Sequence, residues 1–270
     1  MSDDTGPVVL LFTGSDPTGG AGIQADIEAI ISMGCHPAPV ITAVTAQDTT
    51  GLKDYALVET QLVIAQARAV LEDIPVAAIK TGMLGNCANL SAVASILADY
   101  PDIPVVLDPV QSTGARAALA DESLDDALRA LLVPRATLMT PNSDEARRLA
   151  PDADTTDACA QELMWLGCKY VLITGTHART PQVINHLYGN MRKLKSFECE
   201  RLPHVYHGSG CTLASACAAA LAHGLEPVNA VARALEYTWD SLKHAHRLGL
   251  GQHIPDRLYW ARHRTTPDGD

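Results

Sequence analysis

The sequence contains few aromatic residues and no excess of positive charge. Phe, Trp and Tyr together make up 4% of the 270 residues, so the core must be built from Ala, Val, Leu and Ile. The 20 Lys and Arg residues are outnumbered by 31 Asp and Glu residues, which gives a formal net charge of −11. Because binding to a phosphate backbone requires a basic surface, this balance argues against a nucleic-acid partner. A nucleotide remains possible, since backbone N–H groups and a few cations hold small phosphates.

Cysteine pairs, membrane-length apolar runs and secretion signals are also missing. The seven Cys residues include no CxxC pair and no cluster with His, which predicts reduced and mostly buried thiols instead of a zinc site. No apolar run approaches the roughly 18 residues that a membrane span requires. The first residues lack the basic and apolar segments of a signal peptide. We therefore expect a cytoplasmic protein without a membrane partner.

Short apolar runs alternate with helical periodicities along most of the chain. Buried strands are predicted at 8–12, 38–46, 76–80, 104–107, 136–140 and 169–173. Helices are predicted at 23–33, 60–73, 88–99, 121–132, 142–150, 155–166, 210–224 and 227–246. The polar span 182–200 is expected to form a hairpin that turns at 188–190. This alternation predicts an α/β fold in which helices cover both faces of a mainly parallel sheet. Because the composition nowhere shifts, we expect one domain at 1–264 and a frayed tail at 265–270.

Polar residues stand at the C-terminal ends of the predicted strands. They are Asp16, Gln47, Lys80, Asp108, Asn142 and Thr174. In open α/β sheets, ligands bind at the carboxyl ends of the strands. The sequence therefore predicts a ligand site along this edge of the sheet.

A glycine-rich turn, His207-Gly208-Ser209-Gly210-Cys211, opens the helix expected at 210–224. Gly208 and Gly210 let the backbone approach a ligand, and the N–H groups of the first helical turn favour an anion such as a phosphoryl group in transit. The helix terminus is expected to lower the pKa of the Cys211 thiol, which can then take a proton from a substrate hydroxyl. A plain glycine-rich helix cap accounts for the same residues, and the motif alone does not decide between them.

Three further motifs each have a structural and a functional interpretation. The loop that begins at Gly14 is glycine-rich but lacks the Lys-Ser/Thr pair of a Walker A loop. It can form the wall of a small-molecule pocket that Asp26 faces, or it can be a tight turn. Asn142 and Glu145 have the spacing of a capping box, although Glu145 can also hold Mg²⁺ through water. Asp108 can help to bind Mg²⁺ or phosphates, or can simply form a turn.

Taken in order, these stretches resemble the hydroxymethylpyrimidine/phosphomethylpyrimidine kinases of the ribokinase-like superfamily. The matching stretches are GSDPTGGAGIQADIEA (14–29), VITAVTAQDTTG (40–51), IKTGMLG (79–85), VVLDPV (105–110), TPNSDEA (140–146) and HGSGCTLASACAAAL (207–221). The resemblance implies a three-layer α/β/α sandwich, usually a homodimer. It also implies transfer of the ATP γ-phosphoryl group to 4-amino-5-hydroxymethyl-2-methylpyrimidine, and often to its monophosphate, in thiamine biosynthesis.

The resemblance further implies roles for individual residues. Cys211 matches the proposed catalytic base, within an anion hole formed by Gly208, Ser209, Gly210 and Cys211. The residues that match the pyrimidine pocket are Gly14, Asp26, Val44, Gln47 and Met83. Asp108 and Glu145 match the carboxylates on the Mg²⁺ side. The residues expected on the ATP side are Asn142, Thr174 and Gly175.

Three stretches depart from the family pattern. Thr174 replaces a phosphate-binding Lys, although sugar kinases and pyridoxal kinases often carry Thr there. The segment 110–116 differs from the usual loop, which bears on the second phosphorylation. The region 178–200 is short and does not reveal an adenine pocket. The alternatives are a pyridoxal or pyridoxine kinase and a non-catalytic paralogue that binds the pyrimidine. Gln47 with Asp26 favours the aminopyrimidine, because pyridoxal lacks the exocyclic amine.

Overall fold

A single nine-stranded sheet forms the middle of the molecule. The computed structural model describes residues 6–110, 121–176 and 180–262, so the segment 111–116 and the expected tail lie outside the described residues. The strand order is β3-β2-β1-β4-β5-β6-β7-β8-β9. The strands are β1 (Val8–Ser15), β2 (His36–Asp48), β3 (Gly51–Leu57), β4 (Val76–Thr81), β5 (Val105–Leu107), β6 (Leu138–Met139), β7 (Tyr170–Ile173), β8 (Gln182–Gly189) and β9 (Arg192–Glu200). Strands β2 to β7 along this order are parallel, whereas β3, β8 and β9 add antiparallel edges.

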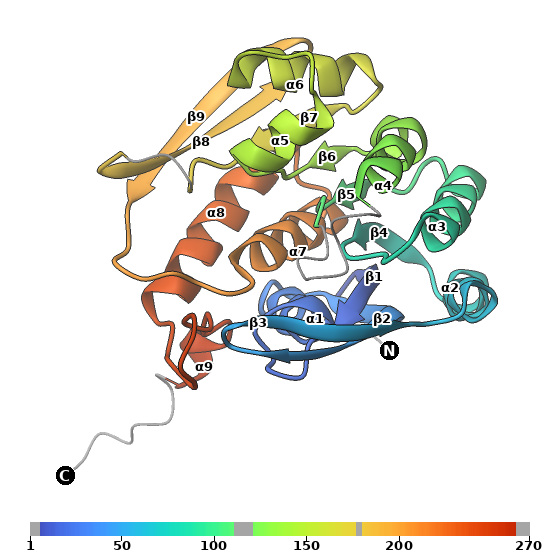
Figure 1. Cartoon of the computed structure of the whole chain (residues 1–270), viewed down its shortest axis with the longest axis horizontal. Coiled ribbons are helices and arrows are strands. Elements are labelled where there is room, and N and C mark those ends of the chain that lie inside the picture. The colour runs from blue at the N-terminus through green and yellow to red at the C-terminus, as the bar shows by residue number, and fades with distance from the viewer. Residues whose placement is uncertain (1–5, 111–120, 177–179, 263–270) are drawn as a thin grey trace.

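Helices cover both faces of the sheet, as the alternation predicted (Figure 1). One layer contains α1 (Gly22–Ser32), α7 (Ser209–Ala222) and α8 (Pro227–Lys243). The other contains α2 (Thr60–Asp73), α3 (Cys87–Asp99), α4 (Asp121–Ala127), α5 (Ser143–Leu149) and α6 (Thr156–Trp165). A short helix, α9 (Tyr259–Arg262), follows near the end of the described chain. The three-layer α/β/α sandwich is therefore confirmed.

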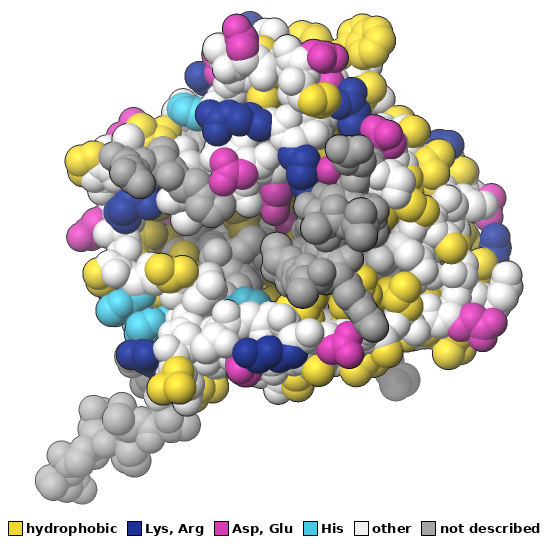
Figure 2. All heavy atoms as spheres, viewed as in Figure 1, with side chains coloured by type: hydrophobic (Ala, Val, Ile, Leu, Met, Phe, Trp, Pro, Cys, Tyr) yellow, Lys and Arg dark blue, Asp and Glu magenta, His cyan; other side chains and the backbone are white. Residues whose placement is uncertain are grey.

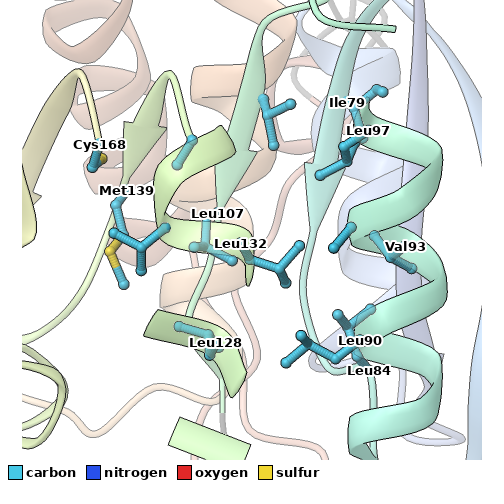
Figure 3. Close-up of a cluster of buried hydrophobic side chains, with 14 of the residues drawn as sticks. Ile79, Leu84, Leu90, Val93, Leu97, Leu107, Leu128, Leu132, Met139 and Cys168 are labelled. Carbon is cyan, nitrogen blue, oxygen red and sulfur yellow. The ribbon is translucent and has the colours of Figure 1, made fainter. Parts of the chain in front are cut away.

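Two separate apolar cores hold the layers together, one on each face of the sheet. Within β1, Leu10 and Phe12 pack into one core while Val9 and Leu11 pack into the other, and all four are fully buried. Figure 3 shows the core beneath α3, where Leu90 and Leu97 lie on the side of the helix near Ile79. Because side chains alternate between the two faces of a strand, a continuous apolar run is the expected sequence of such a strand.

Most predicted elements are confirmed, and the differences have local causes. The sequence analysis missed β3, because its residues show no apolar alternation, none of them is buried, and it pairs with β2 alone. Of the helix predicted at 121–132, the α-helical part ends at Ala127, and Leu128–Leu132 form a π-helical turn directly after it. The 182–200 hairpin turns at Asn190 and Met191, two residues with φ of 51° and 59°, as a two-residue hairpin turn requires.

None of the described helices is long and apolar enough to cross a membrane.

Candidate active site

The carboxyl ends of the parallel strands bring together the polar side chains that were predicted there. Asp16 follows β1, Asp108 follows β5, and Lys80 is the second-last residue of β4. Asn142 and Thr174, which follow β6 and β7, pair with each other through a parallel bridge. The polar residues predicted at this edge of the sheet therefore lie there.

A buried lysine is the centre of a charged network at this edge. Lys80 Nζ donates to both carboxylate oxygens of Asp26, at 3.0 and 2.9 Å, and lies 3.6 Å from Oδ2 of Asp108. The Ser215 hydroxyl, on α7, donates to Oδ1 of Asp26 at 2.7 Å. Burial disfavours the charged form of Lys80, but Asp26, followed by Cys211 and Asp108, outweighs it and raises the pKa of Lys80. The network therefore ties α1, β4 and α7 together with a protonated lysine.

Asp26 occupies this network instead of an open pocket. Its side chain is fully buried, and both of its carboxylate oxygens accept hydrogen bonds from Lys80. The sequence predicted a carboxylate that faces a small-molecule pocket. In the structure, Asp26 faces Lys80 and Ser215.

The N-terminus of α7, from the N-cap Gly208 to Cys211, lies next to Asp108. Gly208 is the N-cap residue with φ of 81°, and a Cβ atom there would overlap the carbonyl oxygen of Gly20. Gly210 also lies against the site, since a Cβ on it would stand 3.9 Å from Asp108 Oδ1. The N–H groups of the first turn have no partner within the helix and suit an anion. Glycine at 208 thus lets the β1–α1 loop and the α7 terminus touch.

The pKa of the Cys211 thiol is shifted in the opposite direction to the one that the motif predicted. Burial, followed by the charge of Asp108, raises the pKa of Cys211 well above its usual range. The prediction of a lowered thiol pKa is therefore wrong, because desolvation and a neighbouring carboxylate outweigh the helix terminus. Burial also raises the pKa of Asp108, while Lys80 and a hydrogen bond from Cys211 act in the opposite direction.

Asn142 and Glu145 form the capping box that their spacing suggested. Asn142 Oδ1 accepts from the backbone N–H of Glu145 at 2.9 Å, and Glu145 Oε2 accepts from the N–H of Asn142 at 2.8 Å. Burial, followed by the charge of Asp108, raises the pKa of Glu145 to about 7. The structural interpretation is thus confirmed, and the same carboxylate also lies within the electrostatic reach of Asp108.

One buried carboxylate oxygen in this region has no hydrogen-bond partner among the described residues. It is the buried Oδ2 atom of Asp108, 3.6 Å from Lys80 Nζ. No group of three or more His, Cys, Asp or Glu side chains in the described chain is arranged to hold a metal ion. Asp108 and Glu145, whose carboxylates interact electrostatically, are the candidates for holding a cation that keeps most of its water ligands.

A second set of contacts surrounds His207, the first residue of the glycine-rich turn. Its Nε2 atom lies 2.7 Å from Asp16 Oδ2 and 2.8 Å from Gln47 Nε2. Burial alone would raise the pKa of Asp16, but hydrogen bonds from His207, Thr18 and Ala21 lower it. The glycine-rich loop, the end of β2 and the α7 motif therefore meet at one imidazole ring.

A pocket of about 420 Å³ opens beside Gln47. Its walls include Thr18, Thr50, Leu248 and Ile254, which belong to the β1–α1 loop, the β2–β3 hairpin and the C-terminal segment. Figure 2 shows a hollow near the middle of the displayed face, with acidic side chains along one side and a histidine at the other.

The other predicted pocket residues differ in their surroundings. A Cβ atom on Gly14 would lie 3.3 Å from Met83 Sδ, so these two residues are in contact. Val44 is 53% exposed, although it lies in β2 between β1 and the edge strand β3. On the expected nucleotide side, the Gly175 N–H donates to Asn185 Oδ1 at 3.1 Å, so a phosphate would have to displace this bond.

Sequence reasoning placed Lys80 at the ligand edge of the sheet without naming a partner for it, and it singled out neither Ser215 nor Arg257. A signal for Lys80 was available, because a lysine within a buried apolar strand requires a charged partner. No pattern marks Ser215 within its Ala-rich helix, or Arg257 near the end of the chain. Their roles depend on which helices and loops the fold places beside them.

Comparison with known proteins identifies the family of the chain. Residues 16–256 match the family model described as phosphomethylpyrimidine kinase. The chain belongs to this family. It is 41% identical over 253 residues to the hydroxymethylpyrimidine/phosphomethylpyrimidine kinase of Mycobacterium tuberculosis, which covers 92% of each chain. The resemblance stated from the motifs is thereby confirmed.

Two solved structures have the same fold. The ADP complex of Bacillus subtilis pyridoxal kinase superimposes with a TM-score of 0.84 at 29% identity, covering 95% of this chain and all of that one. The phosphomethylpyrimidine kinase of Clostridium difficile gives a TM-score of 0.74 at 30% identity, covering 88% and 100%. The ribokinase-like fold is thus shared with kinases of two vitamin precursors, so the fold by itself does not select the substrate.

Proposed function

We propose that the protein phosphorylates 4-amino-5-hydroxymethyl-2-methylpyrimidine, and then its monophosphate, with ATP in thiamine biosynthesis. The observation that carries the proposal is the family match over residues 16–256, combined with a glycine-rich α7 terminus above buried Asp108 and Lys80. The N–H groups of Gly208 to Cys211 would receive the phosphoryl group as its negative charge develops. Phosphoryl transfer depends mainly on such positioning and charge stabilisation.

The substrate hydroxyl must lose a proton, and two neighbouring groups are candidates to receive it. At neutral pH the raised pKa keeps Cys211 in its thiol form, in contact with Asp108. We assign proton removal to the Cys211–Asp108 pair acting together. The thiol orients the substrate hydroxyl, and the Asp108 carboxylate, which accepts a hydrogen bond from this thiol, takes the proton while the negative charge passes to the substrate oxygen.

Asp108 and Glu145 fit the binding of Mg²⁺. Mg²⁺ usually binds proteins through one or two carboxylates while it keeps several waters and contacts the substrate phosphates. Asp108 contributes an oxygen without a hydrogen-bond donor, and Glu145 a carboxylate whose pKa of about 7 allows ionisation near neutral pH. When bound, Mg²⁺ would neutralise phosphate charge. Asn142, which caps α5 beside Glu145, and Thr174, its bridge partner, would lie on the ATP side of this pair.

The pyrimidine would lie on the side of Gln47. The Gln47 amide can donate and accept hydrogen bonds in one plane, as recognition of an aminopyrimidine requires. Gly14 and Met83, which touch each other, would form the wall behind the ring. Asp26 would not touch the pyrimidine, because its carboxylate is fully buried. It would influence the site by holding Lys80 in place.

Pyridoxal kinase activity is the second candidate, because the Bacillus subtilis pyridoxal kinase structure superimposes over 95% of the chain. The two candidate substrates differ in their ring, because only the aminopyrimidine carries an exocyclic amine. A Gln47→Leu variant would lose recognition of the exocyclic amine, so it should affect the aminopyrimidine more than pyridoxal.

We also propose that the protein is a cytoplasmic homodimer. Val44 and Leu57, on the β2–β3 hairpin, are 53% and 38% exposed, which makes this sheet edge a candidate for the contact between subunits. Analytical ultracentrifugation would show a mass of twice 28.7 kDa if the dimer forms.

Turnover of ATP by the purified protein tests the proposed function. Hydroxymethylpyrimidine, its monophosphate and pyridoxal should be supplied as separate acceptors. Cys211→Ala is expected to lower kcat by about 10²- to 10⁴-fold, the range for losing a group that assists proton transfer. Cys217→Ala is the matched control, because Cys217 is buried on the same helix within the apolar core. Tight binding of the pyrimidine without turnover of any acceptor would favour the non-catalytic paralogue.

A further inference from the structure

A buried arginine connects the two glycine-rich segments of the candidate active site. Arg257 is 1% exposed and follows the last residue that the family model matches. Its Nη1 and Nη2 atoms donate to the carbonyl oxygens of Gly19 and Gly20, the first at 3.2 Å. Its Nε atom donates to the hydroxyl of Thr212, on α7, at 2.8 Å. One planar guanidinium therefore contacts both the β1–α1 loop and α7.

The contact with Thr212 extends to the N-cap of α7. The Thr212 hydroxyl accepts from Arg257 and donates to the carbonyl oxygen of Gly208 at 2.8 Å. Gly208 in turn lies so close to Gly20 that a Cβ atom would not fit between them. The side chain of Arg257 thus fixes three carbonyl groups, those of Gly19 and Gly20 directly and that of Gly208 through one hydroxyl.

The backbone of Arg257 is itself held in place, so the guanidinium is anchored. Its carbonyl oxygen accepts from the Ser32 hydroxyl at 2.7 Å and from the Tyr237 hydroxyl at 2.9 Å. Ser32 ends α1 and Tyr237 belongs to α8, which are both in the layer that contains α7. Glu28 supplies a partial counter-charge, 3.2 Å from Nη1 and 41% exposed.

We propose that Arg257 is a positioning residue for phosphoryl transfer. It holds the anion-binding terminus of α7 at a fixed distance from the β1–α1 loop, which would line the pyrimidine site. The proposal rests on the proposed function for its kinetic consequence, although the structural consequence is independent of it. A lysine cannot replace this arginine, because an ammonium group lacks the planar fork that reaches both loops.

Arg257→Lys is the direct test. We expect kcat for the pyrimidine to fall by about 10- to 100-fold, since a shift of about 1 Å in a reacting group can cost that much. KM for ATP and for the pyrimidine should each change by less than about threefold. Arg262→Lys is the matched control, because Arg262 lies on the same terminal segment and pairs with Asp256 at a surface where its side chain is 67% exposed. This control should retain the kcat of the unchanged protein.

A second variant tests the route through α7. Thr212→Val removes the hydroxyl that links Arg257 to Gly208 and should lower kcat as well. The double variant Arg257→Lys/Thr212→Val should have a kcat no lower than that of Arg257→Lys alone, because both changes interrupt the same contact. If Arg257→Lys fails to fold, Thr212→Val still decides the proposal by the same split between kcat and KM.

Hydrogen exchange provides a readout that does not require turnover. Amides at 16–22 and 207–212 should exchange faster in Arg257→Lys, whereas the β4 and β5 amides should keep their rates. If the unchanged protein shows no kinase activity but this local difference appears, the proposed function fails and the structural role of Arg257 stands. Unchanged kcat together with unchanged exchange at both segments would overturn the proposal, as would a uniform rise in exchange over the whole chain.

Discussion

Removing the charge of Lys80 should destabilise the protein more than any surface charge change. Lys80→Met keeps most of the apolar volume but leaves Asp26 and Asp108 facing each other in a fully buried region. Breaking a buried ion pair from one side typically costs about 3–5 kcal/mol, because an uncompensated charge remains. We expect a loss of that size at pH 7.5. The loss should be smaller at pH 5, where one of the two carboxylates can take up a proton.

Urea denaturation followed by circular dichroism at the two pH values measures this difference. The double variant Lys80→Met/Asp26→Asn removes the stranded charge as well and should recover a large part of the stability. Lys53→Met is the control, since Lys53 and its partner Asp48 are 59% and 52% exposed and such pairs contribute at most about 1 kcal/mol. A Lys80→Met protein within about 1 kcal/mol of the unchanged protein at both pH values would refute the reasoning.

Two further predictions concern Glu145 and Gly208. The raised pKa of Glu145, about 7 against an ordinary 4.5, means that the folded protein binds this proton more tightly, so stability should fall as pH rises through that window. Glu145→Gln keeps an oxygen for the capping box and should flatten this slope in denaturation series, while calorimetric titration should show weaker Mg²⁺ binding. In the unchanged protein, Mg²⁺ affinity should rise with pH near 7; affinity independent of pH would contradict the assignment. Gly208→Ala should cost more than about 1 kcal/mol in thermal denaturation. Gly224→Ala has a similar positive φ, 78°, but open space around its Cβ, so equal losses would exclude the clash with Gly20.

The sequence was sufficient for the elements whose periodicity reflects burial. The helix predicted at 60–73 has those bounds in the structure, because its apolar residues repeat along one face. Strand β3 could not be recognised in the same way. Its residues have no apolar pattern, and it forms because the long strand β2 presents an unpaired edge directly before it in the chain. Edge strands of this kind depend on tertiary context.

For the candidate site, the sequence was sufficient to select residues but not to give their protonation. Residues that stand in glycine-rich motifs or directly after strands, such as Cys211 and Asp108, could be selected from the sequence. Their protonation could not, because it depends on distances between elements remote in the chain. The motif predicted a thiol activated by a helix terminus, whereas in the fold the thiol is buried against a carboxylate. In the proposed function, proton removal is therefore a property of the Cys211–Asp108 pair.

The charges in the described site also explain how the chain can tolerate Thr174 where the family often has a lysine. Lys80 is committed to Asp26 and Asp108, and Arg148 lies 3.4 Å from Asp125, so both cations already pair with carboxylates. Neither of them is free to replace the missing lysine at a phosphate. Under the proposed function, neutralisation of the phosphates would come from the α7 terminus and from a cation held by Asp108 and Glu145. We expect a site of this kind to bind ATP weakly without a divalent cation, because Lys80 already faces the two carboxylates of Asp26 and Asp108 and leaves no surplus positive charge for the phosphates.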